Sequence, residues 1–333
     1  MGHGAGGELM NKLIADAILK NLDIRESGKV TLKALDDGAS ITLGDKEIVF
    51  TTDGHTVKPI FFPGGDIGRL AACGTINDVA VMGARPLALA CSLIIEEGFL
   101  IENLERIIKS LNSACREVDV SVATGDTKVM ERGSLESIVV TTTGVGIVEN
   151  GRVITDAGLR PGDRIIVSGT VGDHGVSLMS FREDFGFETT LKSDVAPVWG
   201  MVENALEAGN VHAMKDPTRG GIAAALNEFS RKSQIGIVID EERIPLRDEV
   251  VAASEMLGID PYTVACEGKI LVGVARDDAE EVLKALRGIE PGRDAEIIGD
   301  VVNEHPKRVV LRTSVGGKRL MEMPVGDPVP RVC

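Results

Sequence analysis

Four aspartates in this chain stand beside glycine or another turn-forming residue, where a carboxylate has room to reach a bound ion. They lie in the stretches TTDGH, TINDVAVMGA, TGDTKV and KDPTRGG, as Asp53, Asp78, Asp126 and Asp216. Mg²⁺ that accompanies a nucleotide takes one or two protein carboxylates besides phosphate oxygens and water, and a site for two ions takes more. Any one of these stretches could be an ordinary turn. Because the four are spread over both halves of the chain, together they favour a magnesium site for a phosphate compound.

A glycine-rich stretch, GHGAGG at residues 2–7, precedes a run with helical periodicity. Backbone N–H groups at the start of a helix can hold phosphate, which makes Gly4, Gly6 and Gly7 candidates. The stretch lacks the Gly-Lys-Ser/Thr ending of a Walker A loop, and no strand precedes it, so it is not a dinucleotide fingerprint either. A loose N-terminus explains it equally well.

A second stretch, DPTRGG, is typical of the beginning of a helix. Asp216 or Thr218 would cap the first turn, the two glycines would permit close approach, and Arg219 could hold phosphate. An ordinary capped helix is the alternative. Further along, ACEGKILVGV places Glu267 and Lys269 at the entrance of a buried strand. A charged residue there is either solvated or directed into a cleft, and the pattern does not separate the two.

His55 follows the Asp53 turn and so lies near the candidate phosphate site. The sequence contains no H-x-x-H or H-E-x-x-H pattern, which argues against a zinc enzyme.

Composition excludes several classes of protein. The chain has 333 residues and a net charge of −15, and this charge argues against a nucleic-acid partner. No apolar run approaches the roughly 20 residues that span a membrane, and no signal-peptide pattern opens the sequence. The five cysteines form no C-x-x-C pair, which favours a reducing compartment, the cytoplasm.

Strand and helix patterns alternate irregularly, so we expect an α+β fold of two mixed domains rather than a doubly wound sheet. A turn-rich segment at 150–164 divides the chain into domains 1–155 and 156–323 and a mobile tail, 324–333. Strands are predicted at 29–35, 39–54, 85–95, 137–148, 164–172, 235–240, 269–275, 295–302 and 307–313. Helices are predicted at 8–22, 66–84, 101–118, 174–183, 196–208, after 221, at 248–257 and at 277–287.

The chain ends in VGDPVPRVC, a proline-rich strap with a thiol at its last residue, Cys333. Residues 324–333 in an extended proline-type conformation would reach roughly 28 Å, at about 3.1 Å per residue. That length would carry the thiol between a cleft in its own protein and the active site of a partner.

Taken together, GHGAGG, TTDGHTV, the stretch 62–86, TGDTKV, DPTRGG and the terminal PRVC resemble the HypE family of [NiFe]-hydrogenase maturation proteins. This family is part of the ATP-binding superfamily of aminoimidazole ribonucleotide synthetase, and the resemblance spans nearly the whole chain. Two departures are Gly54, where serine is expected, and Val332, where isoleucine is expected. The resemblance implies two aminoimidazole ribonucleotide synthetase-like domains with a flexible C-terminal tail.

The resemblance also implies a reaction. The terminal thiol would receive a carbamoyl group from a carbamoyltransferase, HypF, and an ATP-dependent dehydration would convert it to a thiocyanate. The cyano group would pass to iron on a HypC–HypD complex as a cyanide ligand for the hydrogenase. A homodimer formed through the N-terminal halves, with ATP near its interface, is implied as well.

Carried onto this chain, the resemblance assigns roles to particular residues. Mg²⁺ would be held by Asp53, Asp78, Asp126 and Asp216. ATP would contact Gly4, Gly6, Gly7, Asn77, Thr127, Thr218 and Arg219. Besides Cys333, the reacting groups would be Lys128 at the phosphates or the substrate oxygen, Glu267 as the base and, ranked lower, His55. Two other interpretations stay open: a small-molecule kinase of the same superfamily with an inert terminal cysteine, and a binding or scaffold protein whose tail only docks.

Overall fold

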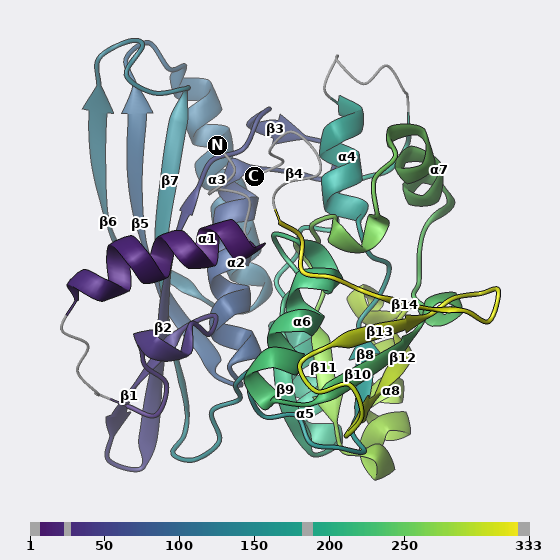
Figure 1. Cartoon of the computed structure of the whole chain (residues 1–333). Helices are drawn as coiled ribbons and strands as arrows, with labels where there is room; N and C mark the ends of the chain where they lie inside the picture. The colour runs from purple at the N-terminus through teal and green to yellow at the C-terminus, as the bar shows by residue number, and fades with distance from the viewer. Residues whose placement is uncertain (1–6, 23–27, 182–188, 326–333) are drawn as a thin grey trace.

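The structure of the chain, a computed structural model, describes residues 7–22, 28–181 and 189–325. Two parts, each with its own β-sheet, lie side by side, and helix α1 (Gly7–Leu13) lies across the front of the N-terminal part with one end at the boundary between them (Figure 1). Cys333, Gly4 and Gly6 lie outside the described residues.

The N-terminal part is built on a five-stranded sheet in the order β1-β2-β7-β5-β6. β5 and β6 are parallel, whereas the other neighbours are antiparallel. Buried and less buried residues alternate along β5 and β7, as expected for strands with one face on a core. Helices α2 (Ile67–Val81) and α3 (Ile101–Glu117) cover that face. The strands are β1 (Ala39–Leu43), β2 (Lys46–His55), β5 (Arg85–Glu96), β6 (Ser121–Met130) and β7 (Ile138–Glu149).

Helix α2 is buried on almost every side because it lies between the N-terminal sheet and the C-terminal part. It begins after Asp66, whose Oδ1 accepts hydrogen bonds from Gly68 N at 2.9 Å and Arg69 N at 3.0 Å. This capping satisfies two of the amide groups that the first turn leaves unpaired. α2 therefore presents residues to both parts of the molecule at once.

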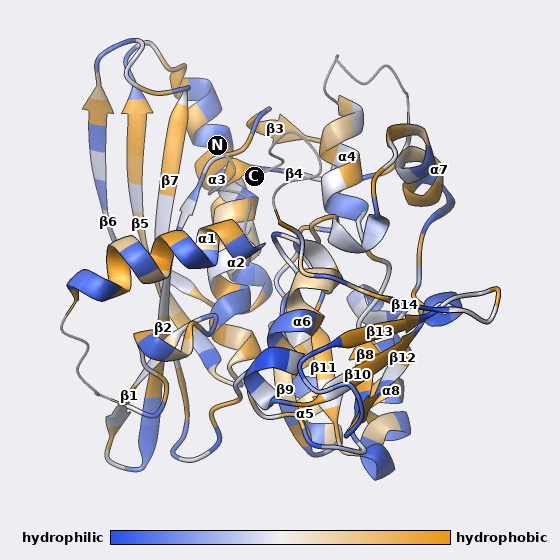
Figure 2. Cartoon of the chain, viewed as in Figure 1, coloured by the Kyte–Doolittle hydropathy of each residue, from blue (hydrophilic) through white to orange (hydrophobic). Residues whose placement is uncertain are grey.

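The C-terminal part has a seven-stranded sheet in the order β14-β13-β10-β12-β8-β11-β9. Figure 2 shows the strands of this sheet as mainly hydrophobic, and all four residues of β11 are buried. Ile222 and Phe229 of α6 pack on one face of the sheet, and Val202 of α5 and Leu283 of α8 on the other. The strands are β8 (Arg164–Val167), β9 (Val211–Lys215), β10 (Gly236–Asp240), β11 (Leu271–Val274), β12 (Glu296–Val302), β13 (Val309–Arg312) and β14 (Lys318–Leu320). The helices are α4 (Asp173–Phe181), α5 (Trp199–Ala208), α6 (Gly221–Ser233), α7 (Asp248–Leu257) and α8 (Ala279–Arg287).

Short elements complete the chain. α1 continues through a π-helical turn and a 3₁₀ turn to Asn21, and β3 and β4 form a two-stranded ribbon ahead of α2. No helix among the described residues has the length and apolar character needed to cross a membrane. The remaining bounds are Ile14–Ile18, Leu19–Asn21, Leu32–Ala34, β3 (Phe61–Phe62), β4 (Gly65–Asp66), Glu241–Arg243, Pro261–Thr263, Arg276–Asp278 and Glu290–Gly292.

The predicted α+β class with two mixed domains is confirmed, and most predicted elements form. The prediction of a strand at 29–35 is wrong. Leu32–Ala34 form a 3₁₀ turn instead, and Leu35, which follows it, has left-handed backbone angles with φ 49°. Five strands were not predicted: the short β3 and β4, and β6, β9 and β14. β6 and β14 lack the alternation that identifies a half-buried strand, because nearly all their residues are exposed.

Candidate functional site

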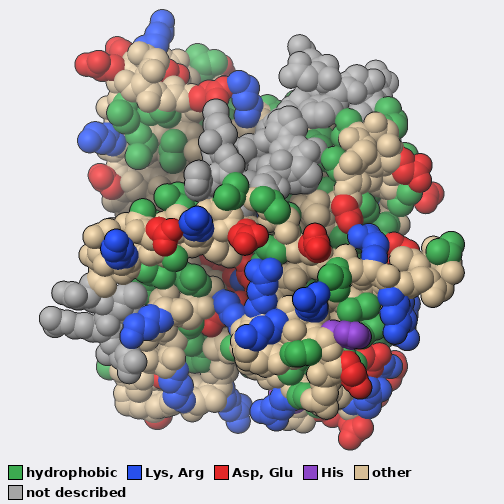
Figure 3. Space-filling view, in the orientation of Figure 1, with side chains coloured by type: hydrophobic (Ala, Val, Ile, Leu, Met, Phe, Trp, Pro, Cys, Tyr) green, Lys and Arg blue, Asp and Glu red, His purple; other side chains and the backbone are tan. Residues whose placement is uncertain are grey.

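A cavity of about 690 Å³ opens on the seam between the two parts, with α1 on one wall. Figure 3 shows acidic side chains recessed between the two parts, with Lys and Arg side chains on the neighbouring rim. A volume of this size is in the range of ligand sites. The carboxylates in the lining are those of Asp36, Asp37, Asp53, Asp78, Asp216, Glu228 and Glu267.

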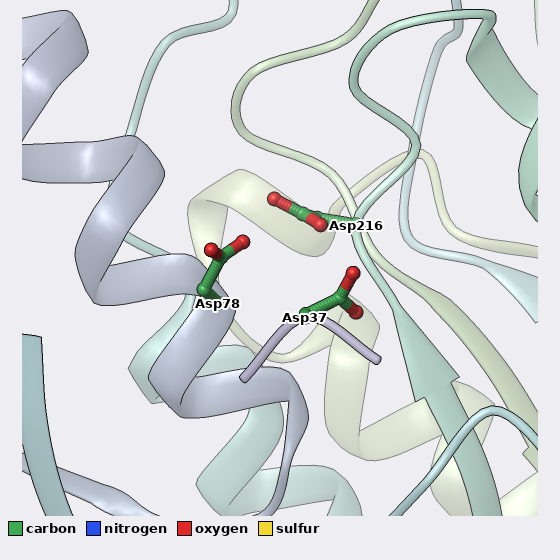
Figure 4. A group of neighbouring side chains, drawn as sticks. All are labelled: Asp37, Asp78 and Asp216. Atoms are coloured by element: carbon green, nitrogen blue, oxygen red, sulfur yellow. The ribbon is translucent and has the colours of Figure 1, made fainter. Parts of the chain in front are cut away.

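Three of these carboxylates converge from separate segments of the chain. Asp37 comes from the loop before β1, Asp78 from α2, and Asp216 from the residue after β9. One oxygen of each lies within 4.8 Å of the other two, and the three side chains point toward one point (Figure 4). Oxygen ligands in this number suit a hard divalent cation such as Mg²⁺.

The charges at this point are poorly compensated by the protein. Burial raises the pKa of Asp216 to about 8, with Asp37 and Asp53 adding to the rise and Lys215 opposing it. Burial also raises the pKa of Asp78 well above its usual range, helped by Asp53 and Asp216. Asp216 Oδ2 is buried and has no hydrogen-bond partner among the described residues. A cation at this point would supply the missing partner, so the residues fit a magnesium site.

One buried lysine faces the cluster from the C-terminal part. The Lys215 ammonium pairs with Asp37 and lies 3.3 Å from Glu228 Oε2 and 3.7 Å from Asp156 Oδ2. Burial opposes its charge, yet the carboxylates of Asp37, Glu228 and Asp156 hold the pKa of Lys215 well above its usual value. Lys215 therefore stays charged and fixes Asp37 at the seam.

Asp53 and His55 stand at the end of β2, joined by a chain of hydroxyl groups. Thr75 Oγ1 lies 3.4 Å from Asp53 Oδ2 and 2.5 Å from Thr142 Oγ1, which lies 3.2 Å from His55 Nε2. Burial lowers the pKa of His55, although Asp53 opposes this. Gly74 permits the arrangement, because a Cβ at this position would lie 3.0 Å from His55 Cε1.

Thr218 and Arg219 line the cavity in the loop that leads into α6. The predicted cap of this helix is wrong: its N-cap is Gly220, at φ 79°, and no side chain caps it. Gly221 is needed for packing within the protein, since a Cβ on it would lie 2.5 Å from Tyr262 O.

Glu267 also lines the cavity, next to the acid cluster. Burial raises its pKa well above the usual range, and Asp216, Asp194 and Asp53 add to the rise. Lys269, which like Glu267 lies just ahead of β11, is directed elsewhere, with its ammonium 3.6 Å from Asp194 Oδ2. Of the two charged residues ahead of this strand, Glu267 is therefore directed into the acid-lined cavity and Lys269 is not.

The base of the C-terminal tail also reaches the cavity mouth. Gly7, the first described residue, lines the cavity, and a Cβ on it would lie 2.1 Å from Pro324 O. Gly7 has φ 72°, a conformation that favours glycine. The tail therefore departs from a point against the N-terminal end of α1.

The structure separates four predicted site residues from this cavity. Asp126, Thr127 and Lys128 lie on β6, the exposed edge strand of the N-terminal sheet, and do not line the cavity. Asn77 is buried on α2, and its amide is bonded to the backbone of the C-terminal part.

Sequence reasoning missed Asp37 and Lys215. Asp37 lies in LDDGAS, an acidic pair followed by glycine ahead of a strand, which matches the pattern used for the other aspartates. Lys215 directly precedes Asp216, but a single lysine at the end of a strand gives no signal of its own.

Comparison with known proteins agrees with this architecture. Two family models match the chain: AIR synthase related protein, N-terminal domain, over residues 35–148, and the C-terminal domain of the same family over residues 160–312. The fold and the acid-lined seam therefore define an AIR synthase related protein.

Its relatives are more specific. The chain is 55% identical to a hydrogenase expression/formation protein of Methanocaldococcus jannaschii, over 99% of this chain and 98% of that one. It is 45% identical to the carbamoyl dehydratase HypE of Rhizobium leguminosarum bv. viciae, over 100% of this chain and 94% of the relative. The chain belongs to the HypE family.

Two solved structures support this assignment. In a HypE–HypF complex, the matching chain is 43% identical with a TM-score of 0.87, covering 96% of this chain and 100% of that one. A hydrogenase maturation protein HypE in complex with ATP is 39% identical with a TM-score of 0.83, covering 99% of this chain and 98% of that one.

Proposed function

We propose that this chain is an ATP-dependent carbamoyl dehydratase that converts an S-carbamoyl group on Cys333 to a thiocyanate, the source of a cyanide ligand in [NiFe]-hydrogenase maturation. The observation that carries the proposal is the position of the tail. Pro324 lies against Gly7 at the mouth of the acid-lined cavity, so the last eight residues start beside the site. In an extended form, those residues span roughly 25 Å, which is enough to enter the cavity.

The chemistry requires a phosphorylating site. An S-carbamoyl group loses water poorly because oxide is a poor leaving group. Transfer of the γ-phosphoryl group of ATP to the carbamoyl oxygen makes that oxygen part of phosphate, which leaves readily. Loss of the two N–H protons then gives S–C≡N, so the carbamoyl group and ATP become thiocyanate, ADP and phosphate.

The residues at the seam divide this work. Asp37, Asp78 and Asp216 would hold Mg²⁺, which neutralises the charge on the transferred phosphoryl group; Asp53 stands beside them as a further ligand. Thr218 and Arg219 would contact the phosphates, as would Gly7 at the start of α1. Glu267, whose buried carboxylate binds a proton strongly, is our candidate for the base that takes an N–H proton. His55 ranks after it.

Asp126, Thr127 and Lys128 enter the proposal through a homodimer. All three are exposed on β6, whose outer edge has no strand partner among the described residues. We place the dimer contact along this edge and ATP near the interface, which would bring Lys128 to the phosphates or the substrate oxygen. Asn77 acts by orienting the two domains rather than by touching ATP.

The partners follow from the chemistry of the carrier thiol. HypF would load the carbamoyl group on Cys333, as the solved HypE–HypF complex suggests for this family, and an iron-bearing HypC–HypD complex would accept the cyano group. The four described cysteines are free and buried, in keeping with a cytoplasmic protein.

Intact mass spectrometry tests the proposal. After incubation with HypF, carbamoyl phosphate and ATP, the C-terminal peptide should gain about 43 Da and then fall to a gain of about 25 Da, as thiocarboxamide becomes thiocyanate. Cys333→Ala should show neither gain while keeping ATP binding. The absence of any adduct on the wild-type peptide would contradict the proposal.

Truncation separates the alternatives. A small-molecule kinase would keep its turnover when residues 326–333 are deleted, and a scaffold protein would keep its partner binding in Cys333→Ala without any covalent change. The dehydratase loses the reaction in both variants.

A further inference from the structure

A second cavity lies at the other end of the seam. Its volume is about 850 Å³, and its wall is formed by the end of β7, the linker to β8, the turn between α2 and β5, and the segment from α5 to β9. It shares no lining residue with the acid cavity described above.

The charge of this cavity is opposite to that of the first. Arg85, Arg152 and Arg160 line it, and none of the three guanidinium groups has an ion-pair partner within residues 7–22, 28–181 and 189–325. Lys46 also lines the cavity, but it pairs with Glu149, the one acidic residue of the lining. In a chain with 51 acidic and 36 basic residues, three such arginines in one cavity form a site suited to an oxyanion.

The remaining wall offers an aromatic surface and a polar edge. Trp199, at the start of α5, is half-buried, with one side packed on the core that α5 shares with α8. His212 lines the cavity with its Nδ1 2.9 Å from Asp163 Oδ2, so its ring is held in place. An indole beside guanidinium groups can stack on a planar ring while these groups take a phosphate.

The two cavities are connected by shared elements. α2 carries Asp78 to the first cavity, and the second is lined by Gly83, in the turn after α2, and by Arg85, the first residue of β5. β9 has His212 near one end and Asp216 just past the other. The two parts of the chain meet at both cavities, so a ligand in the second would contact both parts: Arg85 belongs to the N-terminal sheet and Trp199 to the C-terminal part.

We propose that this second cavity binds a small phosphorylated ligand with a planar ring, of the nucleoside monophosphate class. The phosphate contacts Arg85, Arg152 and Arg160, and the ring rests on Trp199. The site is separate from the dehydratase site and does not depend on the function proposed for it.

The chain contains its own reporter, because Trp199 is its one tryptophan. Full-length protein is titrated with AMP, inorganic phosphate and adenosine, with tryptophan emission and calorimetric heat as readouts. The expected result is a saturable response to AMP, with phosphate and adenosine weaker by at least about ten-fold each, since each keeps only part of the contacts.

Variants locate the response. Arg152→Ala with Arg160→Ala should weaken AMP binding at least about ten-fold, and the Lys substitutions at both positions should restore part of it, because lysine keeps the charge but not the fork of donors. Arg116→Ala, on an exposed position of α3 outside the cavity, is the matched control and should bind as the wild type does. Asp216→Asn, in the acid cavity, should keep the tryptophan response.

Three results would overturn the proposal: no saturable response to AMP at millimolar concentration, an unchanged AMP affinity in the double arginine variant, or a response that disappears in Asp216→Asn and so belongs to the first cavity. If inorganic phosphate bound as tightly as AMP, the proposed stacking of a planar ring on Trp199 would be wrong, because the site would then recognise the oxyanion alone. Both arginines are exposed, so the double variant is expected to fold, which thermal unfolding verifies.

Discussion

Asn77, in the N-terminal part, holds the backbone of the C-terminal part next to Val198. Its Oδ1 accepts a hydrogen bond from Val198 N at 2.8 Å, and its Nδ2 donates to Ala196 O at 3.1 Å and to Glu267 O at 3.3 Å. The next residue, Asp78, faces Asp37 and Asp216. Asn77, with three hydrogen bonds to the C-terminal part, and Asp78, with a carboxylate of the acid cluster, are thus adjacent on α2, so domain orientation and cluster geometry are set together.

Asn77→Ala should lower the free energy of unfolding by about 2–4 kcal/mol, because it leaves the buried backbone N–H of Val198 without its partner and removes a donor from the carbonyl groups of Ala196 and Glu267. It should also weaken Mg²⁺-dependent ATP binding, since Asp78 would lose its fixed distance from Asp216. Urea unfolding and calorimetry measure the two effects. Asn112→Ala, at an exposed position of α3, is the control and should change neither. A loss below about 1 kcal/mol would show that other contacts hold the parts together.

Lys215→Ala should destabilise the protein strongly in the absence of magnesium. The Lys215 side chain is 12% exposed and is the cation paired with Asp37 and Glu228, so its removal leaves buried carboxylates uncompensated, at a cost of about 3–5 kcal/mol. Added Mg²⁺ should recover part of this loss by taking the place of the ammonium near Asp37. Urea unfolding with and without Mg²⁺ measures both steps.

Lys284→Ala is the control for this prediction, because Lys284 forms a surface pair with Glu281 in which both side chains are well exposed. It should cost no more than about 0.5 kcal/mol and should show no magnesium effect. If Mg²⁺ stabilised Lys215→Ala no more than the wild type, the acid cluster would not be a cation site.

His174 predicts a loss of stability in mild acid. Its imidazole is fully buried, with Nδ1 2.7 Å from Ser193 Oγ, and burial lowers its pKa to about 4, although Asp194 opposes this. In the unfolded chain the group titrates near 6.5. As pH falls from about 6.5 to about 4, this histidine becomes protonated in the unfolded chain but stays neutral in the folded protein. The free energy of unfolding therefore falls by up to about 3 kcal/mol.

Urea unfolding at pH 7.5 and pH 5 measures this slope in wild-type protein and in two variants. His174→Gln should flatten the loss between the two pH values, because the titrating group is gone. His305→Gln, at an exposed turn, should keep the wild-type slope. Equal slopes in all three proteins would mean that carboxyl groups elsewhere cause the acid sensitivity.

Much of the acid cavity could be predicted from local patterns. Asp53, Asp78, Asp216 and Glu267 were each identified beside a glycine or another turn-forming residue, or at a strand entrance, and the fold brings all four to one cavity. Asp126 matched the same pattern but lies on β6, away from the cavity. An aspartate beside a glycine does not indicate where in the sheet its strand will lie, so the sequence could not show this. Asp37 also stands beside a glycine and was missed; its role depends on Asp78 of α2 and on Asp216 after β9, which are far away in the sequence.

The interdomain contacts were the least predictable part of the structure. The sequence predicts Asn77 as a polar residue of the candidate site. In the structure, its side-chain amide is hydrogen-bonded to backbone groups of Ala196, Val198 and Glu267. Lys215 belongs to no sequence motif. Its role depends on the carboxylates of Asp37, Asp156 and Glu228, which come from three separate segments of the chain. Contacts of this kind depend on how separate helices and strands pack against one another. The periodicity of residues along a single helix or strand does not predict them.

The outer edge of β6 predicts self-association. The strand runs over ten residues, Ser121–Met130, nearly all exposed, and Val122 and Val129 are 44% and 63% exposed. Long exposed strand edges with apolar side chains tend to pair with another chain. We therefore expect the protein at micromolar concentration to sediment at twice the 35.3 kDa chain mass.

Val122→Lys combined with Val129→Lys should shift the protein to the mass of a single chain, because two added charges on each edge would face their counterparts across the interface. Sedimentation velocity measures the shift, and ATP turnover should fall with it if Lys128 acts at the interface. Ile101→Lys, which places a charge on a residue 70% exposed at the start of α3, is the matched control and should stay dimeric. A wild-type protein that sediments as a single chain at tens of micromolar would refute both the β6 interface and the interfacial role of Lys128.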